Sequence, residues 1–446
     1  MPAAGRQMPE EANKLNHRKS MKEKNILHRI SSNLGWSVIS EATGKGVFFV
    51  ANIYLARILG VENFGLFTLA QTVTYYFWLA VDLGTTMYGI REIAKNKEHA
   101  QDIINPLLTL RITAGIIIFT LYSFSILFFL RMPLMNKLTF AGCGLYLLTY
   151  AFYTDWALKG LEKFKYISFG NLASAIVFLA GILTFVKGAH GIIVAALAWS
   201  LAYFFSSASL LILLYKKLDI KYKPSFQFHQ WFHHLRESIF FTISGSLFVL
   251  YQYMPVLLIS IFFTNYEVGI FSAPYKMITG IGSAGLLIPM AFYPIFSEIY
   301  LKDRIKFRKT HLIFQRLMLL LGIPIAIVGN VFKKELVTLI FGTQYVQGIT
   351  TFGIIIWLVP LCFLRYTYGS VLFAMGFQRS HNLATLSGTL GAIIFGMILI
   401  PRLSIVGASI SLIISEIFFI VAMAYVFSRA GREKLDSDIS GKAALK

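Results

Sequence analysis

Charged residues and cysteines are scarce in this sequence. Aspartate, glutamate, lysine and arginine together make up 14% of its 446 residues, whereas soluble domains average about 25%. Hydrophobic residues make up 56%, and the mean hydropathy is +0.66. This composition excludes an ordinary soluble domain. It favours a polytopic membrane protein, because each helical crossing of a bilayer needs roughly 20 mostly apolar residues.

Residue patterns for metal binding and for disulfide bonds are also missing. The two cysteines, Cys143 and Cys362, are far apart and both fall in apolar segments, so we expect small buried side chains. Histidines cluster only at His229, His233 and His234, without the acidic residue of an H-E-x-x-H arrangement. The sequence therefore predicts no metal site and no cofactor.

Sequence motifs of the common enzyme classes are missing as well. We find no P-loop, dinucleotide fingerprint, kinase signature or G-x-S-x-G elbow, so the chain is not expected to hydrolyse ATP itself. The first 33 residues are polar and basic, and they lack the short apolar core and small-residue cleavage site of a signal peptide. We therefore expect no cleaved signal peptide.

Twelve apolar segments account for most of the chain. They predict an all-α protein with about twelve transmembrane helices, and their ranges are 34–58, 64–90, 106–130, 134–157, 166–186, 191–215, 238–263, 268–298, 312–332, 350–373, 381–400 and 404–427.

Basic residues outnumber acidic residues by 41 to 21, and their distribution decides what that charge means. They alternate between the two sides of the predicted spans, with 30 on the side of the N-terminus, 7 on the other side and 4 inside spans. A single basic patch would suggest nucleic acid, but this alternation follows the positive-inside rule. It predicts a cell membrane protein with both termini in the cytosol and no nucleic-acid partner.

The longest internal connection, residues 216–236, divides six spans from six. GLFTLAQ from Gly65 is similar to GIFSAPY from Gly269, and the same offset of 204 positions carries the first span onto the seventh. The sequence therefore predicts two parallel repeats. The expected units are a basic N-terminal segment (1–33), an N-terminal bundle (34–215), a linker (216–236), a C-terminal bundle (237–427) and a tail (428–446).

Four basic side chains lie inside the predicted spans: Lys45, Arg111, Lys276 and Arg365. Charges are costly inside a bilayer and usually face a pathway, so all four are candidate binding groups for an anionic cargo. Each also has a structural explanation. Glu41 precedes Lys45 by one helical turn and could neutralise it. Both arginines could extend to the cytosolic surface, and the prolines and glycines around Lys276 could expose backbone to a cavity.

Four ordered blocks of sequence carry a family resemblance. They are ANIYLARILGVENFGLFTLAQ with DLGTTMYGIREIAK inside residues 34–97, DWALKGLEKFKYISFGN (155–171), EVGIFSAPYKMITG (267–280) and ELVTLIFGTQY (335–345). Together they resemble the Wzx-like polysaccharide-biosynthesis flippases of the multidrug/oligosaccharidyl-lipid/polysaccharide exporter superfamily. The resemblance implies two six-helix bundles around a central cavity. It also implies alternating access that moves a polyprenyl-pyrophosphate-linked oligosaccharide, such as an O-antigen unit, to the outer leaflet. Membrane lipids and other polysaccharide-assembly proteins are the partners it implies.

Such a cargo suggests further candidate residues. Glu41 and Asp82 are candidates for coupling to protons or sodium, although pairing with Lys45 or Arg91 would explain them structurally. Tyr146, Tyr150 and Tyr153 share one helical face and are candidate sugar contacts, although ordinary packing would explain them too.

Alternative functions remain open from the sequence. A lipid II flippase shares the pyrophosphate cargo but commonly has two more spans. A drug or cation exporter of the same superfamily would favour acidic residues in the cavity. A glycan polymerase or ligase would need a large external loop, and the longest here is only about 333–349. An adaptor without transport activity would not need buried charge.

Overall fold

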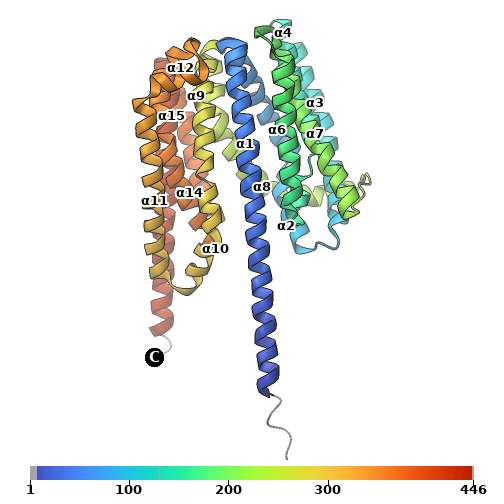
Figure 1. Cartoon of the computed structure of the whole chain (residues 1–446), viewed down its shortest axis with the longest axis vertical. Helices are drawn as coiled ribbons and strands as arrows, with labels where there is room; N and C mark the ends of the chain where they lie inside the picture. The colour runs from blue at the N-terminus through green and yellow to red at the C-terminus, as the bar shows by residue number, and fades with distance from the viewer. Residues whose placement is uncertain (1–7, 130, 444–446) are drawn as a thin grey trace, which may run out of the picture.

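Helices make up the protein, as the sequence predicts. The computed structural model describes the backbone of residues 8–129 and 131–443, and the side chains of residues 35, 44, 46–128, 131–239, 241–243, 245–290, 292–293 and 295–429. No strand occurs in these backbone ranges. Two groups of helices stand side by side, and α1 of the first group and α8 of the second lie where the groups meet (Figure 1).

The first group contains seven helices in chain order. They are α1 (Met8–Asp82), α2 (Thr85–Lys95), α3 (Ala100–Phe124), α4 (Leu134–Ala151), α5 (Asp155–Gly160), α6 (Phe164–Phe185) and α7 (Ile192–Leu218). The second group contains α8 (Phe228–Phe262), α9 (Asn265–Ala284), α10 (Leu287–Lys302), α11 (Arg304–Val331), α12 (Lys333–Phe341), α13 (Ile349–Ile355), α14 (Leu358–Ala374) and α15 (Gln378–Ala443).

Two of these helices, α1 and α15, each contain a sharp reversal. Gly60 in α1 has φ +77°, and Ser404 in α15 has φ +50°. Positive φ costs glycine little, whereas it is costly for serine. A Cβ atom at Gly407 would lie 2.2 Å from the carbonyl oxygen of Leu399, so the chain after Ser404 doubles back on the preceding helix. Both reversals fall in or beside the predicted breaks at 59–63 and 401–403.

The number of crossings agrees with the sequence. In the described chain, eight helical stretches are long and apolar enough to cross a membrane, or nine when the bent pair Asn265–Met290 and Ile295–Lys302 is counted as one crossing. Two of these stretches contain the reversals in α1 and α15, and the shorter α4 supplies a further segment. The fold class of about twelve transmembrane helices in two bundles is thereby confirmed.

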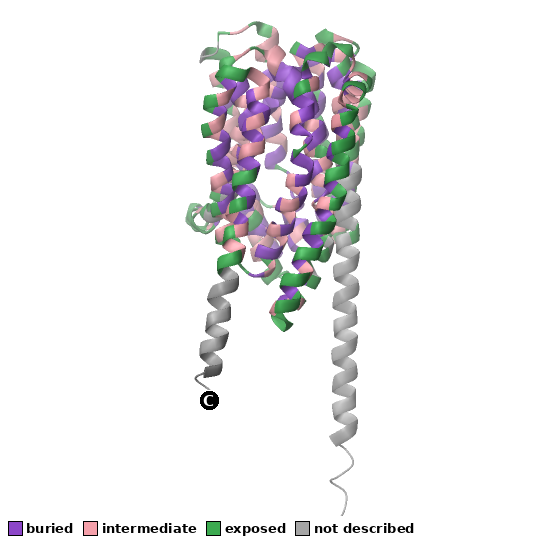
Figure 2. Cartoon of the chain, turned by 90° about the vertical axis from the view of Figure 1, so that its left-hand side faces the viewer, coloured by how far each residue is buried: buried purple, intermediate pink, exposed green. Residues whose placement is uncertain are grey.

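Apolar side chains cover the outside of the bundles. Figure 2 shows buried residues toward the interior and exposed residues along the outer helix faces. Phe128, Phe185 and Leu320 are among the large apolar side chains that are more than two-thirds exposed. Large apolar surfaces of this kind mark contact with lipid or protein rather than water. The outer surface therefore fits a multi-pass membrane protein.

Polar side chains begin two helices of the second group. Thr264 and Glu267 form a capping box at the start of α9, in which the Thr264 backbone N–H donates to Glu267 Oε2 at 3.0 Å. Asp303 Oδ1 accepts from the backbone N–H groups of Ile305 and Lys306 at the start of α11, both at 2.9 Å. These caps satisfy backbone donors that a helix leaves free.

The connection between the two groups is partly helical and is attached to the first group. Helix α7 ends at Leu218 and α8 begins at Phe228, so the last part of the predicted linker is helix. Asn105 and Thr109 of α3 accept hydrogen bonds from the backbone N–H groups of Lys223 (3.1 Å) and Ser225 (2.9 Å). These bonds hold the non-helical part of the linker against α3.

Glycines related by the predicted repeat meet where α1 crosses α9. A Cβ atom at Gly65 would lie 1.8 Å from the carbonyl oxygen of Asn265, and one at Gly269 would lie 2.0 Å from that of Val61. The two members of each equivalent pair, 61 with 265 and 65 with 269, are 204 positions apart. The contact is therefore reciprocal, as at a two-fold axis. The bundles are pseudo-symmetric, and their axis passes through this crossing.

Replacing Gly65 with alanine should destabilise the protein. The added methyl group would meet backbone rather than a mobile side chain, and overpacking of this kind costs typically 1–3 kcal/mol. We expect a lower thermal midpoint for purified Gly65→Ala in detergent, followed by intrinsic fluorescence. The matched control is Gly46→Ala, because a Cβ atom at Gly46 meets no described atom within 4 Å. Equal midpoints for the two variants would contradict the close crossing.

Candidate functional site

The reversal at Gly60 divides α1 into two arms, one before and one after this residue. A large cavity lies between the first arm of α1 and helices of the second group. Its volume is about 890 Å³, and residues of α1, α8, α9, α10, α14 and α15 line it. Most lining side chains are apolar or aromatic, and the cations among them are Lys276 and Arg365. Its volume falls within the range of about 300–1,000 Å³ that is typical of small-molecule sites.

Lys276 comes from α9, two residues after Pro274. Its Nζ donates to Asn52 Oδ1 at 3.0 Å and to Gln71 Oε1 at 2.9 Å, so it joins the two arms of α1 on either side of Gly60. The ammonium group also lies over the rings of Phe64 and Phe67, at 5.2 and 5.6 Å from their centres. Both hydrogen-bond partners are neutral amides. Among the described side chains no carboxylate forms an ion pair with Lys276, so its charge is not compensated there.

Arg365 comes from α14 and has a carboxylate partner. Its Nε donates to Glu416 Oε1 of α15 at 2.6 Å, and Tyr251 OH of α8 donates to the other carboxylate oxygen. The side chains of Arg365 and Glu416 are 9% and 1% exposed. The guanidinium also lies over Tyr366 and Phe419, at 4.6 and 5.1 Å. This pair adds no net charge to the cavity.

Arg111 lies in the first group, away from the residues that line the large cavity. Its fully buried side chain is 3.5 Å from Asp82 Oδ1, and its Nη1 donates to Thr86 Oγ1 at 3.0 Å. Thr86 in turn donates to Asp82 Oδ1 at 2.5 Å. The guanidinium faces the rings of Tyr150 and Trp156, at 5.1 and 5.8 Å. The structure therefore brings Arg111 and Asp82 together as a buried pair, and cargo or ion binding by either stays a prediction.

Tyr146 and Tyr150 of α4 form one aromatic row with Tyr153, which lies beyond the end of that helix at Ala151. The predicted shared helical face therefore holds for Tyr146 and Tyr150 only. Tyr146, Tyr150 and Tyr153 pack ring to ring at 5.4 Å, and each is at most 8% exposed. Tyr146 stacks on Trp199 at 4.6 Å, and Tyr153 donates to Asn171 Oδ1 at 2.7 Å. None of the three is among the residues that line the large cavity.

The side chains of Lys45 and Glu41 lie outside the described residues. Both therefore stay predictions.

The hydrogen-bond partners of Arg365 and Lys276 were not predicted from the sequence. Glu416 is the only acidic residue between 381 and 427, and a buried arginine needs such a partner, so this isolation could have signalled the pair. Asn52 and Gln71 are neutral, and nothing in their local sequence distinguishes them. Only the reversal at Gly60 brings both to Lys276.

A second, smaller cavity adjoins the first. Its volume is about 270 Å³, and its lining includes Asn52, Gln71, Lys276, Tyr75 and Trp199. Lys276 and Asn52 line both cavities. The smaller cavity lies beside the amides that hold Lys276.

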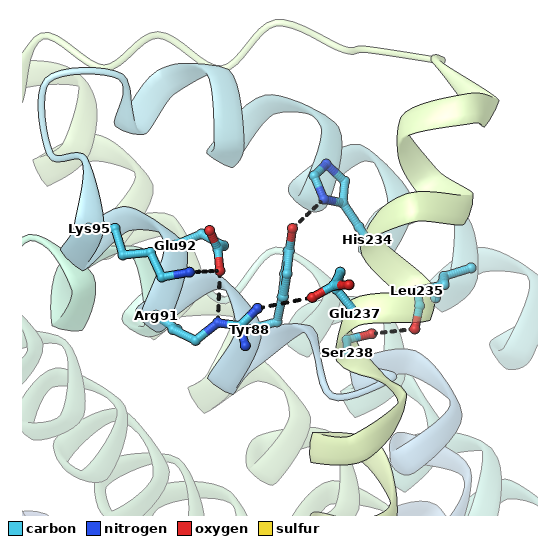
Figure 3. Close-up of polar contacts among 8 residues, drawn as sticks. All are labelled: Tyr88, Arg91, Glu92, Lys95, His234, Leu235, Glu237 and Ser238. Atoms are coloured by element: carbon cyan, nitrogen blue, oxygen red, sulfur yellow. Dashed lines mark hydrogen bonds and ion pairs between the residues drawn. The ribbon is translucent and has the colours of Figure 1, made fainter.

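The two groups of helices also meet between α2 and α8 (Figure 3). Tyr88 OH lies 3.0 Å from His234 Nδ1, and Arg91 Nη2 lies 3.4 Å from Glu237 Oε2. Burial opposes ionisation of Glu92, but hydrogen bonds from Lys95 and Arg91 outweigh it and lower the pKa of this carboxyl. Burial lowers the pKa of His234, with a smaller contribution from His233. Charged and polar groups therefore hold α2 against α8.

Comparisons with known proteins identify relatives in sequence. A family described as polysaccharide biosynthesis protein matches residues 30–300. A putative O-antigen transporter from Shigella dysenteriae is 27% identical over 260 residues, which cover 56% of this chain and 63% of the relative. Another from Escherichia coli (strain K12) is 23% identical over 370 residues, which cover 81% of this chain and 88% of the relative.

Solved structures share the fold. The lipid II flippase MurJ in an inward closed conformation matches with a TM-score of 0.71 and 12% identity, over 88% of this chain and 87% of that one. An inward-facing multidrug resistance MATE family transporter of the MOP superfamily matches with a TM-score of 0.69 and 14% identity, over 88% and 95%. Because the family match covers more than half of the sequence, the chain belongs to the polysaccharide biosynthesis protein family.

Proposed function

We propose that this protein is a flippase that moves a polyprenyl-pyrophosphate-linked oligosaccharide from the cytosolic to the outer leaflet. The observation that carries the proposal is Lys276, which lines the large cavity with neutral amides as its hydrogen-bond partners. Two sequence relatives are named putative O-antigen transporters, which supports this class of cargo. Transport rather than catalysis is the activity we assign.

The cargo sets the physical requirement. A pyrophosphate must cross a layer about 30 Å thick that offers no hydrogen bonds, while its prenyl chain stays in lipid. A cation without a carboxylate partner can supply the missing interaction without first breaking an ion pair. Lys276 meets this requirement as far as the described side chains go, and its two amide partners hold it in place until an anion arrives.

Arg365 is a second cation that can bind the pyrophosphate, provided that Glu416 shares or releases it. Its planar guanidinium suits bidentate binding of phosphate oxygens, but Glu416 occupies it at 2.6 Å. An anion that binds Arg365 must therefore share it with Glu416 or displace that carboxylate. We assign Lys276 the first contact with the pyrophosphate and Arg365 a later one.

Lys276 should be essential for export. Deletion of the gene should cause the lipid-linked oligosaccharide to accumulate in the cytosolic leaflet, and the wild-type gene should restore surface glycan. Lys276→Gln should not restore it, because a charged hydrogen bond is worth about 1.5–3 kcal/mol, or about 10- to 150-fold in affinity. Lys276→Arg should retain part of the activity, because it keeps the charge.

Surface glycan measured by gel and lectin blotting, at equal protein abundance, checks this expectation. Lys334→Gln is the matched control, because Lys334 is exposed in the short α12 outside both cavities. Normal export by Lys276→Gln would contradict the proposed role.

A double variant should separate the role of the Arg365–Glu416 pair in stability from its role in transport. Removing one partner of a buried ion pair costs about 3–5 kcal/mol, whereas replacing both by neutral groups is often tolerated. We therefore expect Arg365→Gln to be unstable and Arg365→Gln/Glu416→Gln to recover most of the thermal stability. The double variant should still fail in export. Wild-type export by a stable double variant would exclude Arg365 from the transport path.

We also propose that the termini face the cytosol and that the protein lies in the cytoplasmic membrane. The excess of basic residues on the side of the termini supports this orientation. The orientation can be tested with single cysteines at two exposed positions, Lys223 in the linker and Lys334 in α12, after Cys143→Ala and Cys362→Ser. The reagent is a membrane-impermeant maleimide, added to cells whose outer envelope is permeabilised and whose cytoplasmic membrane is intact. It should label position 334 and leave position 223 unlabelled. The reverse pattern would overturn the orientation.

A further inference from the structure

The smaller cavity contains hydroxyl groups without partners. Thr68 Oγ1, Thr72 Oγ1 and Ser272 Oγ are buried and make no hydrogen bond to any described atom, and all three residues line the cavity. Their residues are 4%, 1% and 0% exposed. Buried polar groups are normally hydrogen-bonded, so several orphaned hydroxyls around one cavity indicate a ligand that can pair with them.

These residues lie on the seam between α1 and α9, by which we mean the facing sides of the two helices. The seam begins at the crossing of Gly65 and Gly269. Thr68 and Ser272 are repeat equivalents, 204 positions apart, and they lie three residues after Gly65 and Gly269. Residues at i, i+3 and i+7 lie on one face of a helix. The next positions on that face are Thr72 on α1 and Lys276 on α9. The seam is therefore symmetric and neutral near the crossing and becomes asymmetric and charged at Lys276.

Aromatic faces complete the lining of the smaller cavity. The rings of Tyr75 and Tyr253 stack at 4.7 Å, and Trp199 meets Tyr75 edge-on at 5.7 Å. Among the described residues that line this cavity there is no aspartate or glutamate, and Lys276 is the only cation. Hydroxyls, amides and aromatic faces without a carboxylate suit a neutral, polyhydroxylated ligand rather than a metal ion or an organic cation.

We propose that the smaller cavity is a saccharide subsite that holds the sugar directly attached to the pyrophosphate. This inference rests on the proposed function. Lys276 lines both cavities, so a phosphate group at its ammonium places the attached sugar beside Thr72. The volume of about 270 Å³ lies just below the range of drug-sized sites, about 300–1,000 Å³. It suits one sugar ring, and the remaining sugars occupy the large cavity.

The test replaces the orphaned hydroxyls with methyl groups of similar shape. Thr68→Val/Thr72→Val removes two hydroxyls that have no described partner, so no internal hydrogen bond is lost and the fold should be at least as stable as wild type. Thr139→Val is the matched control. Thr139 is equally buried and its hydroxyl donates to the Met135 carbonyl oxygen within α4, outside both cavities.

Two lipid probes separate the sugar from the pyrophosphate. One is the glycolipid fraction extracted from cells that lack this gene, and the other is undecaprenyl pyrophosphate without sugar. Binding to the purified full chain is measured for wild type, Thr68→Val/Thr72→Val and Thr139→Val. We expect the double variant to bind the glycolipid about tenfold more weakly, to bind the sugar-free lipid normally, and to keep its thermal midpoint. Thr139→Val should bind both as wild type does.

Each other outcome has a defined meaning. Unchanged glycolipid binding by the double variant, or an equal loss for both lipids, would overturn the saccharide subsite while leaving the flippase intact. Failure of the wild-type protein to bind either lipid would overturn the proposed function and the subsite with it.

Discussion

The crossing of α1 and α9 at Gly65 and Gly269 is the contact on which the site depends. It brings the backbones of the two halves together, because a Cβ atom at either glycine would lie within 2.0 Å of a carbonyl oxygen of the other helix. The reversal of α1 at Gly60 then places both of its arms beside α9. As a result, Asn52 and Gln71, which are far apart along α1, both reach the ammonium group of Lys276.

Charge in the membrane interior is distributed unequally. Arg111 pairs with Asp82 and Arg365 pairs with Glu416, and these described pairs are buried, at no more than 14% side-chain exposure. Pairing lowers the cost of keeping such charges away from water. Lys276 breaks the pattern, because its partners among the described side chains are amides and aromatic rings and not a carboxylate. A protein that only needed a stable fold would have no reason to keep this charge.

The sequence predicted the fold well and the site in part. Hydropathy predicted most of the apolar helices and the breaks near Gly60 and Ser404, because those features are local. It missed the break at Leu83 and Gly84 inside 64–90 and the break between α9 and α10 inside 268–298. The offset of 204 positions predicted the repeat and the equivalence of Gly65 with Gly269. It did not predict that the two glycines meet, which depends on how the halves pack. Depth in a span identified Lys276 and Arg365 as candidates. Depth did not show that Arg365 pairs with a carboxylate while Lys276 binds amides, because these partners lie on other helices or on another part of the chain. The same limit applied to Arg111, whose depth resembles that of a pathway residue although it lies in a buried ion pair with Asp82.

The central claim is that Lys276 binds the pyrophosphate of the cargo. Its most direct test is equilibrium binding of sugar-free undecaprenyl pyrophosphate to purified wild-type and Lys276→Gln proteins of equal thermal stability, over a range of salt concentrations. The account predicts binding by the wild type that weakens as salt rises, and at least about tenfold weaker binding by Lys276→Gln. Equal affinities for the two proteins at every salt concentration would contradict it.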